Sequence, residues 1–277
     1  MIVIYNGMLE IQMTDEEMAK FYQNKNKGNE FGLLENQYLI IKNMDGDIVD
    51  KYRWKSSTLK DISYKKIKTQ MLGEIKPKNV KQQCYFDLLN DNEIKVKVVV
   101  GKAGTGKSFI ATNWAVEKLM DSTFDRLIVL RNNIQTRGVR EIGFRRGDTD
   151  EKLSGFLSFM KDIITPENFE QLKFEERLES PYLGEIRGRN FSKCIVYCSE
   201  IQDSDQQLIK TIISRIGQNS VLLLDGDMNQ CDSVHFEGEL NGINAICRSL
   251  GGNSLFGVVE LDKCERSDVA ALADLIE

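Results

Sequence analysis

The sequence has 277 residues, of which 41% are hydrophobic and 29% are charged, and its formal net charge is −5. This composition is typical of a folded globular protein and excludes a disordered chain. No apolar run approaches the ~18 residues of a transmembrane helix, and the apolar start of the chain is too short for a signal peptide. We therefore expect a cytoplasmic protein with no membrane partner. The acidic balance also argues against indiscriminate polyanion binding by the whole surface.

The cysteines give no support for a zinc site. None of the six forms a CxxC pair, and the chain has a single histidine, His235. A Cys/His zinc site needs closely spaced ligands of these two types. We expect reduced thiols that pack in the core.

Residues 1–75 predict a small β-rich region with one short helix. Thr14 and Glu17 have the spacing of a capping box at a helix start. Two β-like segments, Leu39–Lys42 and Ile48–Tyr52, flank an Asp-Gly turn of the kind that closes hairpins. We expect this region to be an attachment to a larger core.

Residues 76–277 predict an α/β core. Short apolar strands are expected at Ile94–Val100, Arg126–Leu130, Cys194–Cys198, Val221–Leu224 and Phe256–Leu261. Helices are expected at Lys107–Met120, at about 203–216 and at Ser267–Ile276. Short, nearly all-apolar strands that alternate with helices imply a mainly parallel sheet covered by helices on both faces.

A P-loop follows the first of these strands. The segment Gly101–Ser108 reads G-K-A-G-T-G-K-S and opens the predicted helix, which is the context that supports the motif. Its glycines let backbone N–H groups turn toward phosphates at a helix N-terminus. We predict ATP and Mg²⁺ as cofactors, with Lys107 on the β- and γ-phosphates and Ser108 on the metal. The predicted nucleotide-binding residues of the loop are Gly101, Ala103, Gly104, Thr105, Gly106, Lys107 and Ser108.

A P-loop ATPase also needs carboxylates from another strand, for the metal and for the attacking water. Ser199-Glu200-Ile201-Gln202 follows the strand that ends at Cys198 and looks like the D-E-x-Q segment of helicase-like ATPases. Ser199 stands where that segment has its first carboxylate. We predict that Glu200 is the general base and that Gln202 senses phosphate. The missing carboxylate puts the rate of hydrolysis in question.

The next strand ends in Asp225-Gly226-Asp227, with Gln230 close behind. In parallel α/β sheets, ligands bind in the crevice at the carboxyl ends of the strands. We predict Asp227 as a metal ligand and Gln230 as a catalytic residue. Either Asp225 or Asp227 is a candidate for the carboxylate that Ser199 lacks.

The order of these segments resembles the PhoH family of P-loop ATPases, from about Leu33 to the end of the chain. The likeness is carried by Pro77-Lys78-Asn79 with Gln82, Ile142-Gly143-Phe144, Arg187-Gly188-Arg189, Arg215 with Gly217, Gly226-Asp227 with Gln230 and Asp232, and Glu265-Arg266-Ser267.

This resemblance implies that Gln82 contacts adenine and that the chain forms a homo-oligomeric ring, expected to be a hexamer. It also implies a catalytic arginine, which we assign to Arg266; Arg187, Arg189 or Arg266 could act across the subunit interface on the γ-phosphate. Longer members carry a PIN nuclease domain. We expect none here, because about 35 residues precede the similar region and a domain normally needs about 50.

Residues 51–81 are rich in basic side chains and also contain aromatic ones. The basic residues are Lys51, Arg53, Lys55, Lys60, Lys65, Lys66, Lys68, Lys76, Lys78 and Lys81. With Tyr52, Trp54 and Tyr64 nearby, they suit phosphate contacts and base stacking. They suit an ordinary solvated face equally well.

Three functions are compatible with these patterns. We favour an ATPase that acts on RNA or another single-stranded nucleic acid. A second hypothesis is a nucleotide-gated assembly protein, in which Ser199 makes turnover slow. A third is a small-molecule kinase, although no lid or acceptor pocket can be recognised. Turnover with and without single-stranded RNA distinguishes the three.

Overall fold

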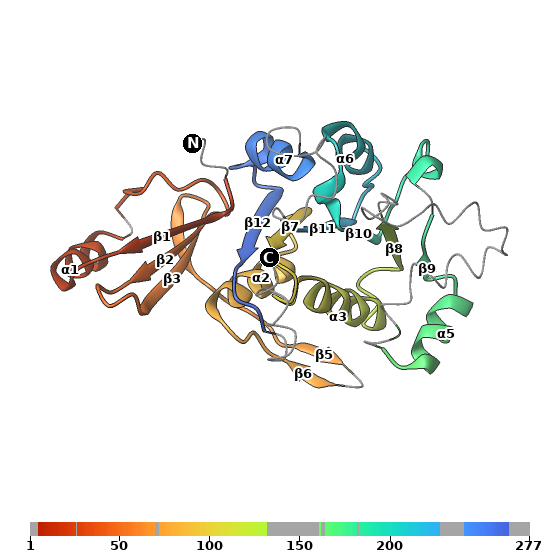
Figure 1. Cartoon of the computed structure of the whole chain (residues 1–277), viewed down its shortest axis with the longest axis horizontal. Helices are drawn as coiled ribbons and strands as arrows, with labels where there is room; N and C mark the ends of the chain where they lie inside the picture. Colours follow the sequence, from red (N-terminus) through yellow and green to blue (C-terminus); the bar gives the residue numbers. More distant parts are fainter. Residues whose placement is uncertain are drawn as a thin grey trace, which may run out of the picture.

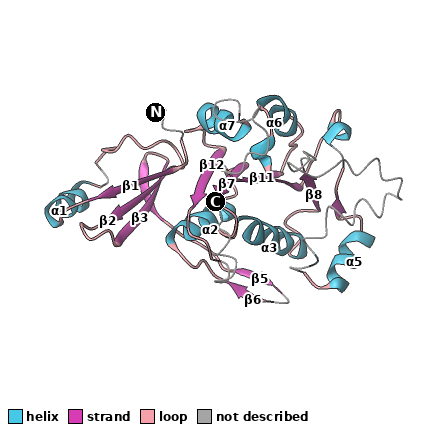
Figure 2. Ribbon diagram, in the orientation of Figure 1, coloured by secondary structure: helices cyan, strands magenta, loops and turns pink. Residues whose placement is uncertain are grey.

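The chain folds into a large α/β unit with a smaller β-rich region at one side (Figures 1 and 2). The computed structural model describes residues 5–25, 27–69, 72–131, 161, 164–181, 183–227 and 241–265. The described strands form a four-stranded sheet, a two-stranded hairpin and a six-stranded sheet. None of the described helices is long and apolar enough to cross a membrane.

The six-stranded sheet is parallel at every described pairing and has the order β12-β7-β11-β10-β8-β9. Its strands are β7 (Val96–Gly101), β8 (Arg126–Arg131), β9 (Leu178–Glu179), β10 (Cys194–Ser199), β11 (Val221–Gly226) and β12 (Phe256–Leu261). The predicted parallel sheet is confirmed. Strand β11 lies between the P-loop strand β7 and strand β10, so the carboxyl ends of these three strands meet at one edge.

Helices cover both faces of this sheet (Figure 1). On one face α2 (Val80–Asn90) and α3 (Lys107–Met120) share a core with alternate strand residues such as Tyr197 and Leu223. On the other face α6 (Gln206–Ile213) and α7 (Gly242–Leu250) pack against the residues in between. The strands are therefore apolar on both sides, which explains why they read as continuous hydrophobic runs.

The observed helix boundaries match the predicted ones for one helix of the core and differ for another. Helix α3 spans the predicted range. The helix expected at about 203–216 is shorter, because Asp205 caps α6 by accepting a hydrogen bond from the N–H of Leu208 at 2.7 Å. Before α6 lies the short helix η3 (Ile201–Asp203), and α5 (Pro166–Phe174) and η2 (Leu183–Ile186) lie before β10. The helix predicted at Ser267–Ile276 falls outside the described residues.

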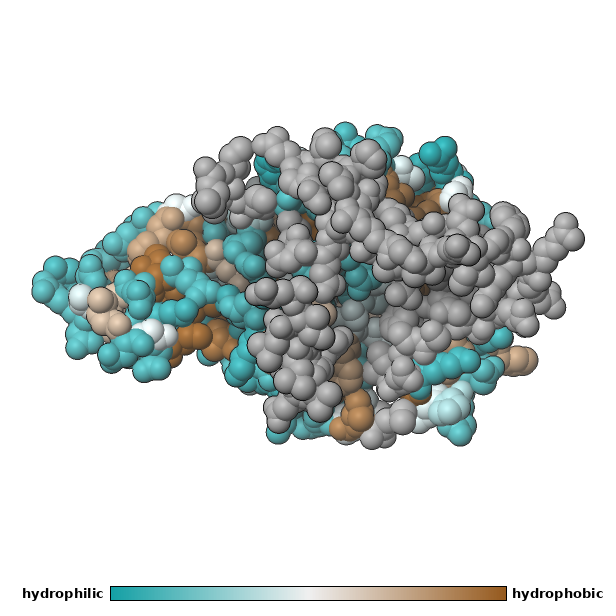
Figure 3. Space-filling view, viewed as in Figure 1, coloured by the Kyte–Doolittle hydropathy of each residue, from teal (hydrophilic) through white to brown (hydrophobic). Residues whose placement is uncertain are grey.

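The N-terminal region contains the predicted hairpin and four further described strands that the sequence did not predict. Strands β1 (Met8–Gln12), β2 (Tyr38–Lys42), β3 (Ile48–Lys55) and β4 (Thr58–Asp61) form a sheet in chain order, followed by the hairpin β5 (Ile67–Thr69) and β6 (Gly73–Ile75). Helix α1 (Asp15–Asn24) begins with the predicted capping box. It buries only Phe21, and Figure 3 shows a mainly hydrophilic surface at this end of the molecule.

A buried ion-pair network joins this region to the core. Arg53 of β3 is 7% exposed, and its guanidinium lies 3.0 Å from Asp87 of α2 and 2.7 Å from Asp91. Lys55 also pairs with Asp91, at 2.6 Å. Burial opposes ionisation of Asp91, but hydrogen bonds from Lys55 and from the backbone of Glu93, with the charge of Arg53, lower its pKa to about 2. The side chains of Arg53 and Lys55 are thus engaged in ion pairs that stabilise the fold. We therefore no longer count these two residues among the basic residues expected to contact nucleic acid.

Arg53→Met tests this network. The substitution removes the guanidinium that faces both carboxylates, so that Asp87 keeps only neutral hydrogen-bond donors and Asp91 keeps Lys55 as its ionic partner. We expect a loss of about 3–5 kcal/mol in the free energy of unfolding near neutral pH. Because the pKa of Asp91 is depressed in the native protein, the contribution of its charge is complete above about pH 4 and is lost as the pH falls toward 2. In the variant the two carboxylates lack the charge of Arg53 and take up protons at higher pH than in the original protein, so the stability deficit of the variant shrinks as the pH is lowered. Urea unfolding at several pH values measures both effects.

The matched control is Lys20→Met, which removes an exposed pair with Glu16 whose side chains are 68% and 79% exposed. We expect it to change stability by less than about 0.5 kcal/mol. Equal losses in the two variants would contradict the structural role of the Arg53 network.

Candidate nucleotide-binding site

The P-loop connects the end of β7 to the start of α3. Gly104 and Gly106 have φ angles of 85° and 93°, a region that favours glycine. A Cβ at Gly106 would also lie 3.2 Å from the side-chain amide of Gln82. The ammonium of Lys107 donates to the carbonyls of Gly101 at 2.5 Å and Lys102 at 2.9 Å. The lysine is therefore held across the loop, at the place where phosphates are expected.

Gln82, a residue of helix α2, is hydrogen-bonded to the P-loop. Its side-chain amide donates to the carbonyl of Thr105 at 3.1 Å and accepts from the N–H of Lys78 at 2.8 Å. The side chain is buried and lines the same cavity as Lys107. This position connects the segment before α2 with the loop, while a contact between Gln82 and adenine remains a prediction.

The carboxylate of Asp225, at the end of β11, is the centre of the polar contacts below the P-loop. One oxygen accepts the Ser108 hydroxyl at 2.8 Å and also the Tyr197 hydroxyl. The other oxygen accepts the N–H of Glu200 at 3.1 Å. Burial raises the pKa of this fully buried carboxyl group, and the hydrogen bonds from Tyr197 and Ser108 act in the opposite direction.

Glu200 projects from the end of β10 at the mouth of the site. Its φ of 56° is uncommon for a non-glycine residue, and strained backbone of this kind is concentrated at functional sites. Its carboxylate accepts from the amide of Gln202 at 2.7 Å. The same amide's oxygen accepts the N–H of Asp227 at 3.2 Å, so Gln202 links the ends of β10 and β11.

Several predicted residues line one cavity of about 450 Å³. Its lining includes Gln82, Ala103, Gly104, Gly106, Lys107, Ser108, Glu200 and Asp227. Gly101, Thr105 and Gln202 lie behind these residues, where they contact Lys107, Gln82 and Glu200 respectively. Gln230 and Arg266 lie outside the described residues, as does the segment Ile142–Gly143–Phe144.

The two arginines of the R-G-R segment have different surroundings. Arg189 lies 2.5 Å from Glu179, and its guanidinium stacks over the Phe191 ring at 4.8 Å. Arg187 is exposed. Arg189 is therefore engaged within its own chain, and the contact with a neighbouring subunit expected for either arginine stays a prediction.

Sequence reasoning did not identify Tyr197, Asn241 or Glu265 as parts of this site. Tyr197 is the one aromatic residue in a strand of small and aliphatic side chains, a signal that could have drawn attention to it. Asn241 caps α7 and donates to the carbonyl of Gln202 at 2.7 Å. The N–H of Glu265 donates to Gly104 at 3.0 Å, and its carboxylate accepts from Asn79 at 2.8 Å. These contacts come from distant parts of the chain, so local motifs do not reveal them.

The residues present suit a nucleotide with a divalent cation. The glycine-rich turn at a helix N-terminus presents backbone N–H groups, and Lys107 adds a positive charge. The Ser108 hydroxyl and the Asp225 carboxylate place two neighbouring oxygen atoms of the type that Mg²⁺ prefers beside the loop.

Comparison with known proteins gives one consistent family. The family model for PhoH-like protein matches residues 74–274, which is more than half of the chain. Protein PhoH2 of Thermobispora bispora is 31% identical over 202 residues, covering 72% of this chain and 46% of that protein. Protein PhoH2 of Bacillus subtilis is 26% identical over 288 residues, covering 98% of this chain and 64% of that protein.

The chain thus spans less than two thirds of the length of these relatives. Among solved structures, the DnaC helicase loader covers 68% of this chain at a TM-score of 0.30 and 13% identity, a similarity too low to bear on function. The match over residues 74–274 includes the P-loop and the ends of β10 and β11, where the polar contacts of the site gather. The chain belongs to the PhoH-like protein family.

Proposed function

We propose that this protein binds ATP with Mg²⁺ and hydrolyses it, and that this activity serves RNA or another single-stranded nucleic acid. The observation that carries the proposal is that Lys107, Ser108 and Glu200 line one cavity at the carboxyl edge of the parallel sheet. A phosphate-binding loop and a candidate base for water therefore share one site, as NTP hydrolysis requires.

Each side chain has a separate role in the proposed reaction. Lys107 and the loop N–H groups bind and orient the phosphates. Glu200, which is exposed at the mouth, accepts the proton of the attacking water, and Gln202 keeps the Glu200 carboxylate in place. A bound Mg²⁺ would neutralise charge on the β- and γ-phosphate oxygens.

The role of Lys107 in binding ATP can be tested by substitution. Lys107→Ala removes a charged donor to phosphate, so we expect ATP affinity to fall about 10- to 100-fold. Lys102→Ala, at an exposed neighbouring position of the loop, is the control and should change affinity by less than about threefold. Calorimetric titration with ADP and with a non-hydrolysable ATP analogue gives both values. Unchanged affinity in Lys107→Ala would contradict the assignment of the loop.

The role of Glu200 in the chemical step can be tested separately from nucleotide binding. Glu200→Gln keeps the size of the side chain but removes the base, so kcat for ATP hydrolysis should fall about 100-fold or more. Nucleotide affinity should stay within about threefold of the original value, because Glu200 is not expected to bind phosphate. Steady-state phosphate release together with the binding titration tests this. Retention of full turnover would show that another group activates the water.

The second candidate function is a nucleotide-gated assembly protein with attenuated hydrolysis. It is favoured by one observation, the buried serine at position 199 where helicase-like ATPases carry a carboxylate. Under this hypothesis the protein binds ATP tightly, turns over slowly, and gains turnover in Ser199→Asp. Native mass measurement with and without nucleotide tests the proposed homo-oligomeric ring, expected to be a hexamer, under both functions.

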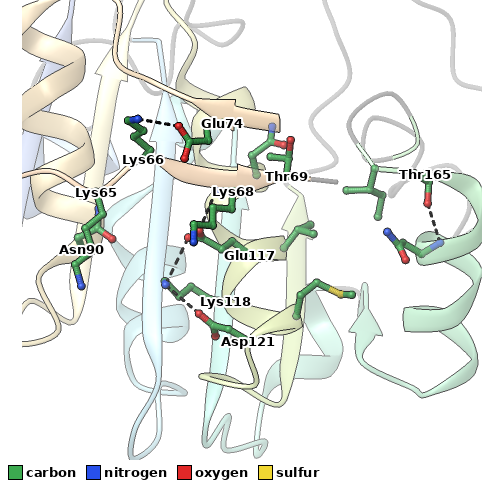
Figure 4. Close-up of a pocket in the computed structure, with 15 residues that line it drawn as sticks. Lys65, Lys66, Lys68, Thr69, Glu74, Asn90, Glu117, Lys118, Asp121 and Thr165 are labelled. Atoms are coloured by element: carbon green, nitrogen blue, oxygen red, sulfur yellow. Dashed lines mark hydrogen bonds and ion pairs between the residues drawn. The ribbon is translucent and has the colours of Figure 1, made fainter. Parts of the chain in front are cut away.

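Nucleic acid binding is proposed for the β5–β6 hairpin. The exposed side chains of Lys65, Lys66 and Lys68 line a cavity of about 850 Å³ between this hairpin, α3 and α5 (Figure 4). Lys66 pairs with Glu74 at 2.8 Å, whereas Lys65 and Lys68 form no ion pair with another described residue. Tyr64, which precedes them, is 41% exposed and offers a ring for stacking.

Charge reversal tests this surface. In Lys65→Glu/Lys68→Glu we expect weaker binding of a single-stranded oligouridine and a slope of log K against log salt that is smaller by about 0.7 for each lost phosphate contact. The control Lys20→Glu/Lys27→Glu reverses two exposed lysines in and just after α1. Fluorescence anisotropy across a salt series measures both. A control that weakens binding as much as the hairpin variant would contradict a specific surface.

A further inference from the structure

The missing carboxylate at Ser199 has a structural counterpart on the neighbouring strand. Strands β10 and β11 pair in register up to Cys198 and Leu224, so Ser199 and Asp225 are the next residues along each strand. Side chains alternate along a strand, so both lie on the same face as Tyr197 and Leu223, the face covered by α3. A carboxylate is therefore present at the expected level of the sheet, one strand closer to the P-loop.

Asp225 also contacts the P-loop directly. Its carboxylate oxygen lies 2.8 Å from the Ser108 hydroxyl, the loop's predicted metal ligand. In an octahedral Mg²⁺ site with metal–oxygen distances of about 2.1 Å, neighbouring ligands lie about 3 Å apart. The observed separation therefore matches that of two neighbouring ligands, or of a ligand and the group that orients a metal-bound water.

Asp227, the residue first predicted for this role, has a different position. It lies two residues further along, beyond the end of β11, and its backbone N–H donates to Gln202. It lines the cavity, but no described hydrogen bond joins it to Ser108. The observed hydrogen bond to Ser108 thus favours Asp225 of the two carboxylates.

We propose that the metal-binding carboxylate of this protein has moved from strand β10 to strand β11, where Asp225 takes the role that Ser199 lacks. The proposal rests on the proposed nucleotide-binding function. Tyr197 is a positioning residue, because its hydroxyl donates to the same Asp225 oxygen that accepts from Ser108. The Asp225 carboxylate then contacts both the P-loop and the candidate base, since its other oxygen accepts the backbone N–H of Glu200.

The test is the gain in nucleotide affinity that Mg²⁺ provides, measured by titrating a non-hydrolysable ATP analogue in Mg²⁺ and in EDTA. We expect Asp225→Asn to reduce this gain at least about 10-fold while affinity in EDTA stays within about threefold. Asp227→Asn should reduce it less than Asp225→Asn does. Asp121→Asn, at an exposed position beyond the far end of α3, is the control.

The exchange variant Ser199→Asp/Asp225→Ser provides a second readout if Asp225→Asn folds poorly, as judged by thermal melting. It returns the carboxylate to β10, and we expect it to recover at least part of the Mg²⁺-dependent gain. Tyr197→Phe should raise the Mg²⁺ concentration for half-maximal binding about 2- to 10-fold and leave affinity in EDTA unchanged. An unshifted midpoint would overturn the positioning role of Tyr197.

Two results would overturn the relocation: a full Mg²⁺-dependent gain in Asp225→Asn, or a greater loss in Asp227→Asn. An exchange variant that folds but recovers none of the gain would also count against it. If the unmodified protein bound the analogue in neither condition, the proposed function itself would fail. These outcomes are distinguishable, because the relocation concerns only the difference between Mg²⁺ and EDTA.

Discussion

The buried carboxylate of Asp225 is the interaction on which the arrangement of the site depends. It accepts hydrogen bonds from the P-loop through Ser108, from the interior of β10 through Tyr197, and from the end of β10 through Glu200. A fully buried carboxylate is costly unless it is hydrogen-bonded, so the three donors stabilise it and are in turn held by it. The phosphate-binding loop and the candidate base are thus positioned by one group.

The order of the strands in the sheet explains why Asp225 can contact both the P-loop and Glu200. Strand β11 is the direct neighbour of β7 and of β10, so a side chain at its carboxyl end lies between the P-loop and Glu200. Helices α2 and α3 close this face, and Gln82 of α2 supports the loop through Thr105. The N-terminal sheet is joined to the same helix α2 through the Arg53 network. Helix α2 therefore contacts both the nucleotide site and the attached β-rich region.

The sequence predicted the core better than the details of the site. Continuous apolar strands and a P-loop that opens a helix are local patterns, and they were sufficient for the parallel sheet and for α3. The parallel pairing of β1 with β2 was missed, because it joins segments separated by α1. Arg53 was grouped with surface lysines, since no local pattern reveals that Asp87 and Asp91 face it across the fold. The sequence showed that Ser199 lacks the expected carboxylate and that Asp225 or Asp227 could supply it. The choice of Asp225 over Asp227 required the register of β10 on β11.

A crystal structure with Mn²⁺ and a non-hydrolysable ATP analogue is the most direct test, because anomalous scattering locates the metal independently of the surrounding density. We predict triphosphate in the P-loop and one metal coordinated by the Ser108 hydroxyl. We further predict that the Asp225 carboxylate ligates this metal, or contacts one of its waters. A metal held through Asp227 without Asp225, or nucleotide bound away from residues 101–108, would contradict these predictions.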